Sequence, residues 1–183
     1  FASAIVFDTN TKPSVYWWQD FWELSEQRTD SHNTEVAIKA VMKELNTFKR
    51  NSPVDYSILR NASIAAFKQN APMDFDQFIT STFVNYVPTD PAITEKLVTV
   101  AAKLKKLPTE KNFDSHFQLV PAAVPFRRRT VPLTDEISIS YEEGMPNLDE
   151  KIWASRTTDG KDVILIEATA ESSKRFKFKQ LGA

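Results

Sequence analysis

The chain has 183 residues, of which 42% are apolar, so it can bury a hydrophobic core without the help of disulfides or metals. With no Cys, and with His32 and His116 as its two histidines, it lacks the residues for a disulfide framework or a thiolate metal site, and we expect neither a metal nor another cofactor. No apolar run approaches the roughly 18 residues of a membrane span, and a formal net charge of -1 requires any nucleic-acid binding to come from local clusters of cations.

Residues 13–24 form the most aromatic segment of the sequence, after a short apolar run at residues 4–7 that suits a strand. A proline at the start of this segment predicts the first turn of a helix. Aromatic side chains offer the largest apolar surfaces for packing, and no cations are interleaved with these to favour base stacking. We expect core or interdomain packing, with Trp18 and Trp22 as candidate partner-binding residues. Because the sequence starts at Phe1 within an apolar pattern, we also expect it to be a piece of a longer protein.

Four more helices are predicted before residue 113. Each has apolar residues at helical spacing, and each begins beside Ser, Thr or Asp, which can accept the free backbone N–H groups of a first turn. The second helix begins at Ser31 or Thr34, the third at Asp55, the fourth at Asp74 or Asp76, and the fifth at Asp90, which precedes a proline.

The third and fifth helices have inward faces that can be assigned. The third should turn inward its small residues and one isoleucine, which are Ile58, Ala62, Ala65 and Ala66. The fifth should turn inward the stripe Ile93, Leu97, Val100, Ala101 and Leu104. Its last turns carry Lys103, Lys105 and Lys106, which either complement the helix dipole or form a partner surface. Pro108 is expected to close the helical part of the chain.

From Phe117 onward the apolar period changes from 3.6 to 2, which predicts strands. Apolar residues and serines alternate at residues 137–141, as in a half-buried strand. The dipeptide Asp159-Gly160 predicts a hairpin with a type I′ turn, and the run Val163–Ile166 suggests that its second strand is covered on both faces. Pro132 cannot donate to a ladder, so we expect the strand that contains it to be an edge strand or to be bulged at this position.

The order of these elements predicts an α+β fold. A mainly helical region at residues 1–112, with about five helices, precedes an antiparallel β-meander at residues 113–183. Because helices come before strands in separate runs, we expect the two regions to pack together as one domain.

The sequence gives little support to an enzyme. A glycine-rich phosphate loop is excluded because the three glycines, Gly144, Gly160 and Gly182, are far apart. The best enzymatic reading is a degenerate metal-dependent nuclease in which Asp162 and Glu167 straddle a strand, but a threonine stands where such a site needs Lys. The acidic pairs at residues 142–143 and 149–150 are expected to be solvated. We therefore predict a protein without catalytic or metal-binding residues.

Arg127, Arg128 and Arg129 are the single run of three consecutive cations in the sequence. In an extended chain the first and third point to one side and the second to the other. Guanidinium groups bind phosphate bidentately and release counterions, so these arginines are candidate DNA-binding residues. The auxiliary candidates are Lys174, Arg175, Lys177 and Lys179 in the C-terminal tail. Alternatively, the arginines pair with the acidic segments at residues 135–136 or 142–143 and bind nothing.

Several packing motifs follow one another along nearly the whole chain. They are Tyr16-Trp17-Trp18 with Phe21 and Leu24, the acidic residue and Thr of 30–34, Met73-Asp74 with Phe78 and Phe83, Phe113 to Leu119 leading into the basic stretch, Leu133, Ile137 to Tyr141, and the Asp159-Gly160 hairpin. In this order the chain resembles the C-terminal half of the bacterial 37-kDa nucleoid-associated protein family, the NdpA-like proteins. The resemblance implies a cytoplasmic, nucleoid-located protein that associates with DNA and, in some members, with a topoisomerase. It supplies no catalytic residues.

Three functions follow from these features. The first is a non-enzymatic nucleoid-associated domain that contacts DNA phosphates with little sequence specificity, since no base-reading helix accompanies the arginines. The second is a protein-interaction module, with a topoisomerase-type partner or another copy of the chain, that does not touch DNA. The third is the degenerate nuclease. Neither of the first two involves a membrane.

Overall fold

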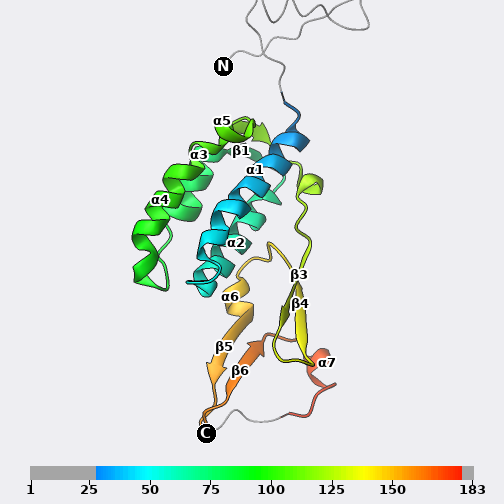
Figure 1. Ribbon diagram of the computed structural model, residues 1–183. Helices are drawn as coiled ribbons and strands as arrows, with labels where there is room; N and C mark the ends of the chain where they lie inside the picture. The colour runs from blue at the N-terminus through cyan, green and yellow to red at the C-terminus, as the bar shows by residue number, and fades with distance from the viewer. Residues whose placement is uncertain (1–27, 179–183) are drawn as a thin grey trace, which may run out of the picture.

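Helices fill the first half of the structure, a computed structural model that describes residues 28–178 (Figure 1). The predicted strand at residues 4–7, the helix at residues 13–24 with Trp18 and Trp22, and the tail residue Lys179 lie outside the described residues. The helices of the described part are α1 (Asp30–Leu45), α2 (Pro53–Phe67), α3 (Phe75–Ile79), α4 (Thr94–Leu104), α5 (Leu107–Lys111), α6 (Leu148–Lys151) and α7 (Ala170–Ser173). The other helical segments are the 3-10 turns η2 (Asn46–Phe48), η4 (Pro91–Ile93) and η5 (Pro121–Ala123) and the π-helix η3 (Thr80–Val84). In this range, none of the helices is both long and apolar enough to span a bilayer.

Two of the predicted helix starts are confirmed. The side chain of Asp74 accepts a hydrogen bond from the backbone N–H of Gln77 at the start of α3, and Asp90 accepts one from Ala92 at the start of η4. The start of α1 was predicted wrongly, because Thr29 is its N-cap in an extended backbone conformation. Pro108 does not close the helical part either, since it lies in the first turn of α5, where the missing N–H has no helical partner to lose.

The predicted start of α2 at Asp55 is also wrong. Asp55 is 1% exposed and lies inside the first turn of the helix. Its carboxylate accepts hydrogen bonds from the Tyr86 hydroxyl at 2.6 Å and from the backbone N–H groups of Thr89 and Asp90 at 2.7 and 3.3 Å. The residue therefore ties α2 to the loop before η4 instead of capping a helix.

The hydrophobic core lies among the helices, with α1 packed against α2, α4 and α5. Phe78 is a centre of aromatic packing, because its ring lies within 6 Å of those of Phe67, Phe75 and Phe83. The predicted inward stripe of η4 and α4 is confirmed as buried. The face predicted for α2 is wrong: Ala62 is exposed and the larger residues Tyr56, Leu59, Ile64 and Phe67 are buried. Large side chains gain more from burial than alanines, so they set the helix orientation.

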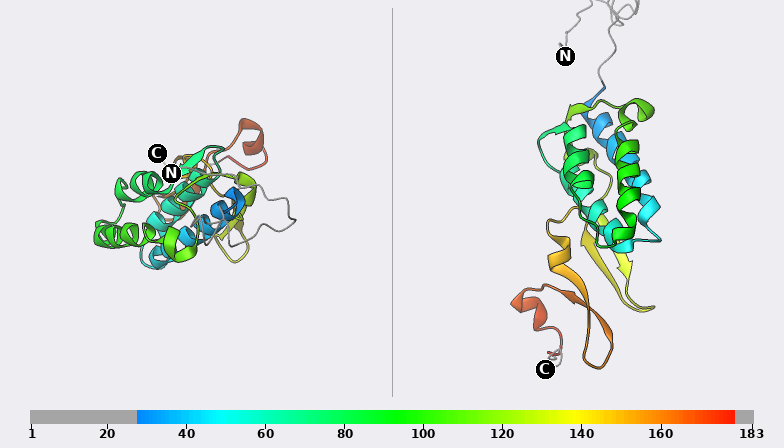
Figure 2. Two further views of the ribbon diagram at one scale, coloured as in Figure 1. Left: turned by 90° about the horizontal axis from the view of Figure 1, so that it is seen from above. Right: turned by 90° about the vertical axis from the view of Figure 1, so that its left-hand side faces the viewer.

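The α+β class is confirmed, but the strands do not form one meander. They form three separate antiparallel pairs, which are β1 (Pro72–Asp74) with β2 (His116–Gln118), β3 (Arg128–Pro132) with β4 (Ser138–Glu142), and β5 (Ile152–Arg156) with β6 (Asp162–Ile166). The last two pairs are hairpins that extend from one end of the helical body, as Figures 1 and 2 show. After Val124, Glu143 is the single buried residue of the described chain. Without a shared buried face, the hairpins have nothing to draw them into one sheet.

The turn between β5 and β6 was also predicted incorrectly in its details. A type I′ turn needs positive φ at both central residues, but only Gly160 has it here, with φ 82°. Gly160 N–H donates to the carbonyl of Thr157, and Thr157 N–H donates to that of Lys161, both at 2.9 Å. These bonds define a longer loop closed by a left-handed glycine. The covered strand predicted at residues 163–166 is wrong too, since Ile164 and Ile166 are 42% and 50% exposed.

Candidate nucleic-acid interface

Five cationic residues line an open groove between the helical body and β3. The groove has a volume of about 470 Å³, and its lining residues are Lys49, Tyr56, Arg60, Pro125, Phe126, Arg127, Arg128, Arg129, Thr130 and Glu143. Lys49 follows η2, Tyr56 and Arg60 belong to α2, and the run from 125 to 130 leads into β3. The arginine run therefore faces cations from the helical body that lie more than 60 residues earlier in the chain.

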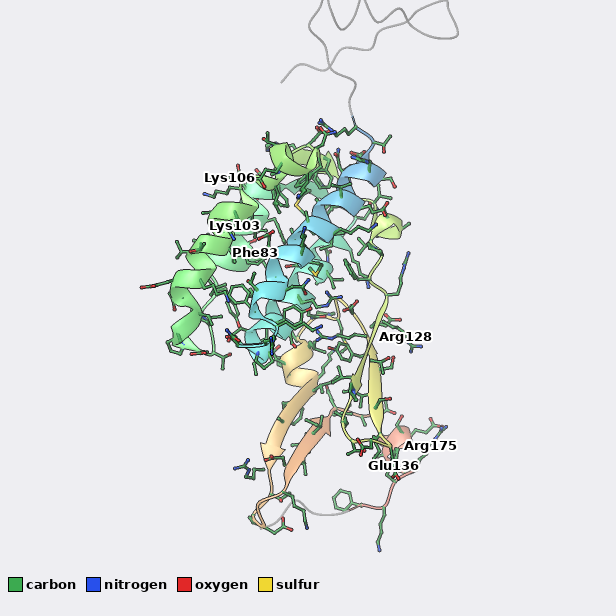
Figure 3. All side chains as sticks on the ribbon, viewed as in Figure 1. Phe83, Lys103, Lys106, Arg128, Glu136 and Arg175 are labelled. Atoms are coloured by element: carbon green, nitrogen blue, oxygen red, sulfur yellow. The ribbon has the colours of Figure 1, made fainter. Side chains whose placement is uncertain are left out.

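The strand register separates the three arginines as an extended chain predicts. Arg129 lies opposite Tyr141, and the Arg127 carbonyl accepts the N–H of Glu143, whereas Arg128 lies opposite Glu142. Arg129 is half-buried and Arg128 is exposed, pointing away from the helices in Figure 3. Two of the three guanidinium groups thus share the side of the strand that faces α2.

Aromatic rings and one carbonyl hold three of the guanidinium groups in place. Arg129 lies over the ring of Tyr56, with 5.4 Å between the guanidinium carbon and the ring centroid. Arg60 lies over Phe126 at 4.8 Å. Arg127 donates from Nη2 to the Ala122 carbonyl at 3.0 Å. A stacked arginine keeps N–H donors free in the plane of its guanidinium group. Because the side chain is already ordered, it loses less conformational entropy when it binds an anion.

The charges of the groove are unbalanced. Its one carboxylate is that of Glu143, which forms an ion pair with Arg60. The Oε1 atom of Glu143 lies 2.6 Å from Nη2 and 2.8 Å from Nε of Arg60. None of the ion pairs among residues 28–178 involves any residue of the run 127–129. The alternative in which the arginines pair with residues 135–136 or 142–143 is therefore wrong. So is the expectation that both residues 142 and 143 are solvated, since Glu143 is 5% exposed.

The other predicted cations lie outside the groove. Lys174, Arg175 and Lys177 follow α7 and are exposed. Figure 3 shows Arg175 near Glu136, at the end of the molecule away from the helical body. The lysines at the end of α4 lie across the helical body from Arg128, as the labels of Lys103 and Lys106 show in Figure 3. Neither group lines the groove, and the DNA-binding role of the tail cations stays a prediction.

Three residues that build the groove were missed from the sequence. Lys49, Tyr56 and Arg60 carried no local signal of their own, although the last two are four residues apart and so share one face of α2. That spacing could have identified an aromatic and cationic pair. It could not have shown which strand lies beside it.

The predicted nuclease residues do not come together. Asp162 and Glu167 stand at the two ends of β6, about 17 Å apart at about 3.4 Å per residue. Asp162 is in an ion pair with Arg156 at 2.7 Å. Across residues 28–178 there is no group of three His, Asp or Glu side chains that could hold a metal ion. The two carboxylates therefore cannot act on one ion.

Comparisons with known proteins identify no relative, because no protein-family model, curated protein or solved structure matches the chain. Similarity to the NdpA-like proteins therefore stays a prediction.

Proposed function

We propose that the groove binds the phosphate backbone of nucleic acid, and of nucleoid DNA in particular, with little sequence specificity. The observation that carries this proposal is that, among residues 28–178, none of Arg127, Arg128 and Arg129 is in an ion pair, in a groove whose one carboxylate already pairs with Arg60. Lys49 adds a further cation at its rim. A phosphodiester backbone offers the repeated anions that such a line of cations binds, and counterion release drives the association.

The elements that line the groove favour backbone contacts over base readout. α2 contributes only Tyr56 and Arg60, Lys49 follows η2, and most of the other lining residues belong to the run 125–130, so no helix offers a series of side chains for reading base edges. Arginine binds phosphate oxygens through two parallel N–H donors, which fixes orientation without reading sequence. The proposed role is therefore that of a non-enzymatic nucleoid-associated protein of the cytoplasm, the role that the resemblance to the NdpA-like proteins implies.

The salt dependence of duplex binding tests this proposal. Fluorescence anisotropy of a labelled duplex, titrated at several salt concentrations, gives the slope of log K against log salt. Replacing Arg127, Arg128 and Arg129 together by Ala should reduce that slope by about 2.7, because each lost phosphate contact removes about 0.9.

A charge-matched control is available at the end of α4. Replacing Lys103, Lys105 and Lys106 by Ala removes the same formal charge from the other side of the molecule. This variant should keep the wild-type slope. Equal losses in both variants would mean that binding follows net charge and not the groove, and absence of binding by the wild type at low salt would reject the proposal.

A second candidate function is protein binding, with a topoisomerase-type partner or another copy of the chain. Apolar side chains exposed on β5 and β6 favour it, among them Trp153 at 43% and Ile166 at 50%. An interface built on such residues should change little with salt, whereas phosphate binding should weaken steeply. The same titrations therefore separate the two functions.

A further inference from the structure

In the part of the chain that the structure describes, the outer edge of β6 is unpaired and apolar. Between Asp162 and Glu167 the strand has four consecutive apolar residues, Val163 to Ile166. β5 is its only strand partner in the described chain, and no other described element packs extensively against it. An open depression of about 520 Å³ beside the hairpin separates it from Pro132 and Leu133 of the neighbouring one. Exposed edges of this kind readily pair with another strand.

The alternation of hydrogen-bonded residue pairs along the β5–β6 ladder shows which backbone N–H and C=O groups of β6 point outward at this edge. Glu167 N–H donates to the Lys151 carbonyl at 2.8 Å, and Thr157 N–H donates to that of Lys161 at 2.9 Å. In an antiparallel ladder the bonded pairs alternate, so the odd-numbered residues of β6 bond to β5. The backbone groups of Asp162, Ile164 and Ile166 therefore point outward. None of them has a backbone partner within residues 28–178.

The comparable edge of β3 is protected. The bonds from Leu133 N–H to Ile137 and from Glu143 N–H to Arg127 give its ladder the same alternation. Arg128, Thr130 and Pro132 are therefore its outward residues. Pro132 has no N–H to offer there, and Arg128 adds a charge, which are two ways in which proteins blunt an edge. On β5, the outward N–H of Ile152 is already bonded to Leu148, whereas Ala154 and Arg156 have no backbone partner at that edge within residues 28–178. In the same range, none of the three outward residues of β6 has one, and its exposed side chains include Ile164 and Ile166.

We propose that β6 pairs antiparallel with β6 of a second copy of this chain, about a two-fold axis through Ile164. The three outward residues are symmetric about Ile164, so each copy's Ile164 lies opposite its counterpart and Asp162 lies opposite Ile166. This register satisfies all the outward backbone groups and yields a four-stranded sheet in the order β5-β6-β6-β5. Because the same surface is used twice, the assembly closes as a dimer.

The charges at the strand ends select this register. It places Lys161 of each copy opposite Glu167 of the other, at positions where facing side chains lie closest. Both residues are exposed, and Lys161, which is in an ion pair with Asp159 at 2.5 Å, would exchange that partner for Glu167 of the other copy. A shift of two residues in one direction would bring Asp159 against Glu167, two like charges, and a shift in the other direction would put Thr169 opposite Lys161. Both alternatives also lose outward hydrogen bonds.

Charge reversal tests the pairing. Lys161→Glu also removes the ion pair with Asp159 in the hairpin loop, whereas Glu167→Lys leaves that ion pair in place. Sedimentation equilibrium of the full chain, without nucleic acid, should show reversible dimerisation of the 20.9 kDa monomer, with Kd on the order of 0.1 mM because the contact is small. Lys161→Glu alone and Glu167→Lys alone should each weaken the dimer at least tenfold, because each creates two pairs of like charges. An equimolar mixture of the two variants should associate as the wild type does, since every facing pair is then opposite in charge.

A backbone variant provides independent evidence. Ile164→Pro removes an N–H that points outward, as Pro132 does in β3, so it spares the β5–β6 ladder and should give a monomer. Circular dichroism checks that each variant is folded, and the charge-reversed pair serves as the test if the proline variant is not. A wild type that stays monomeric at about 1 mM, well above the expected Kd, overturns the proposal. So does a mixture that fails to recover association.

The outcome is independent of the groove. The variant with alanine at positions 127–129 should dimerise with the wild-type Kd, because those residues lie on the other hairpin. Loss of dimerisation in that variant would place the contact on the β3–β4 hairpin and would contradict pairing through β6.

Discussion

Arg60 of α2 and Glu143, which follows β4, form an ion pair with side-chain exposures of 15% and 6% and 2.6 Å between Nη2 and Oε1. The neighbouring Gly144 N–H donates to Asn61 Oδ1 at 2.8 Å, and Asn61 donates to the Met145 carbonyl at 2.7 Å. These contacts hold one end of the β3–β4 hairpin on α2. The Arg60–Glu143 ion pair therefore both joins α2 to the β3–β4 hairpin and neutralises one of the cations of the groove.

Removing Glu143 should destabilise the protein strongly. Glu143→Ala leaves the Arg60 guanidinium largely buried without a counter-ion, and the loss of one partner from such a pair costs about 3 kcal/mol of unfolding free energy. Urea denaturation followed by tryptophan fluorescence and circular dichroism measures the loss. The exposed neighbour Glu142 is the matched control, and Glu142→Ala should change the free energy of unfolding by less than about 0.5 kcal/mol.

The double variant Arg60→Met/Glu143→Met should be more stable than Glu143→Ala, since it leaves no buried charge unpaired. If Glu143→Ala unfolded at the wild-type urea concentration, the ion pair would have no structural role.

Two glycines with the same backbone conformation should respond differently to substitution. Gly144 and Gly160 have φ 81° and 82°, so an alanine at either position costs about 1 kcal/mol in backbone strain. A Cβ at Gly160 meets nothing within 4 Å, but at Gly144 it would lie 3.0 Å from Ile64 Cγ2 and 3.1 Å from the Ala65 nitrogen. Overpacking adds about 1 to 3 kcal/mol. The midpoint temperature of thermal unfolding should therefore be clearly lower for Gly144→Ala than for Gly160→Ala. Equal midpoints would show that α2 shifts to accommodate the added methyl group without loss of stability.

The sequence is informative where structure is decided locally. Asp74 and Asp90 begin helical turns as predicted, because a carboxylate next to free backbone N–H groups needs no distant partner. Asp55 has the same local pattern, but its carboxylate instead accepts a hydrogen bond from Tyr86, which is 31 residues away in the sequence. The separation of the strands into three pairs depends on which faces are buried, and this is a property of the assembled molecule.

The candidate site follows the same division. Arg127–Arg129 stand out in the sequence because they are consecutive, and their alternation along β3 is a local property of a strand. Lys49 and Arg60 join them only through tertiary packing. Glu143 was assigned to solvent because acidic pairs near a proline usually lie in exposed turns, but Arg60 compensates its burial.

The Asp55 carboxylate should make stability depend on pH. Burial alone would raise the pKa of Asp55, but the hydrogen bonds from the Tyr86 hydroxyl and from Thr89 and Asp90 outweigh it and leave the pKa below its ordinary value. A carboxyl group with a lowered folded-state pKa stabilises the protein above its unfolded pKa of about 3.9 and loses this contribution as the pH falls through the folded value. The fold should therefore weaken below about pH 4.

Asp55→Asn isolates this contribution. At pH 7 it should lower the free energy of unfolding by about 1 to 3 kcal/mol, because an amide is a weaker acceptor for three donors. The difference between wild type and variant, measured by urea denaturation, should shrink as the pH falls below about 4. Tyr86→Phe removes one donor and should reduce the same pH dependence in part. A difference that stays constant from pH 7 to pH 3 would contradict the assignment.

Tyr56 should tune nucleic-acid affinity without changing the charge of the groove. Its ring supports the Arg129 guanidinium, an interaction worth about 0.5 to 1 kcal/mol, so Tyr56→Leu should weaken duplex binding about two- to fivefold. The slope of log K against log salt should stay at the wild-type value because every cation remains. Tyr56→Phe keeps the ring and should bind as the wild type does. Equal weakening by Phe and Leu would assign the effect to the hydroxyl, and a slope reduced by about 0.9 would mean that Arg129 leaves its phosphate altogether once the ring is gone.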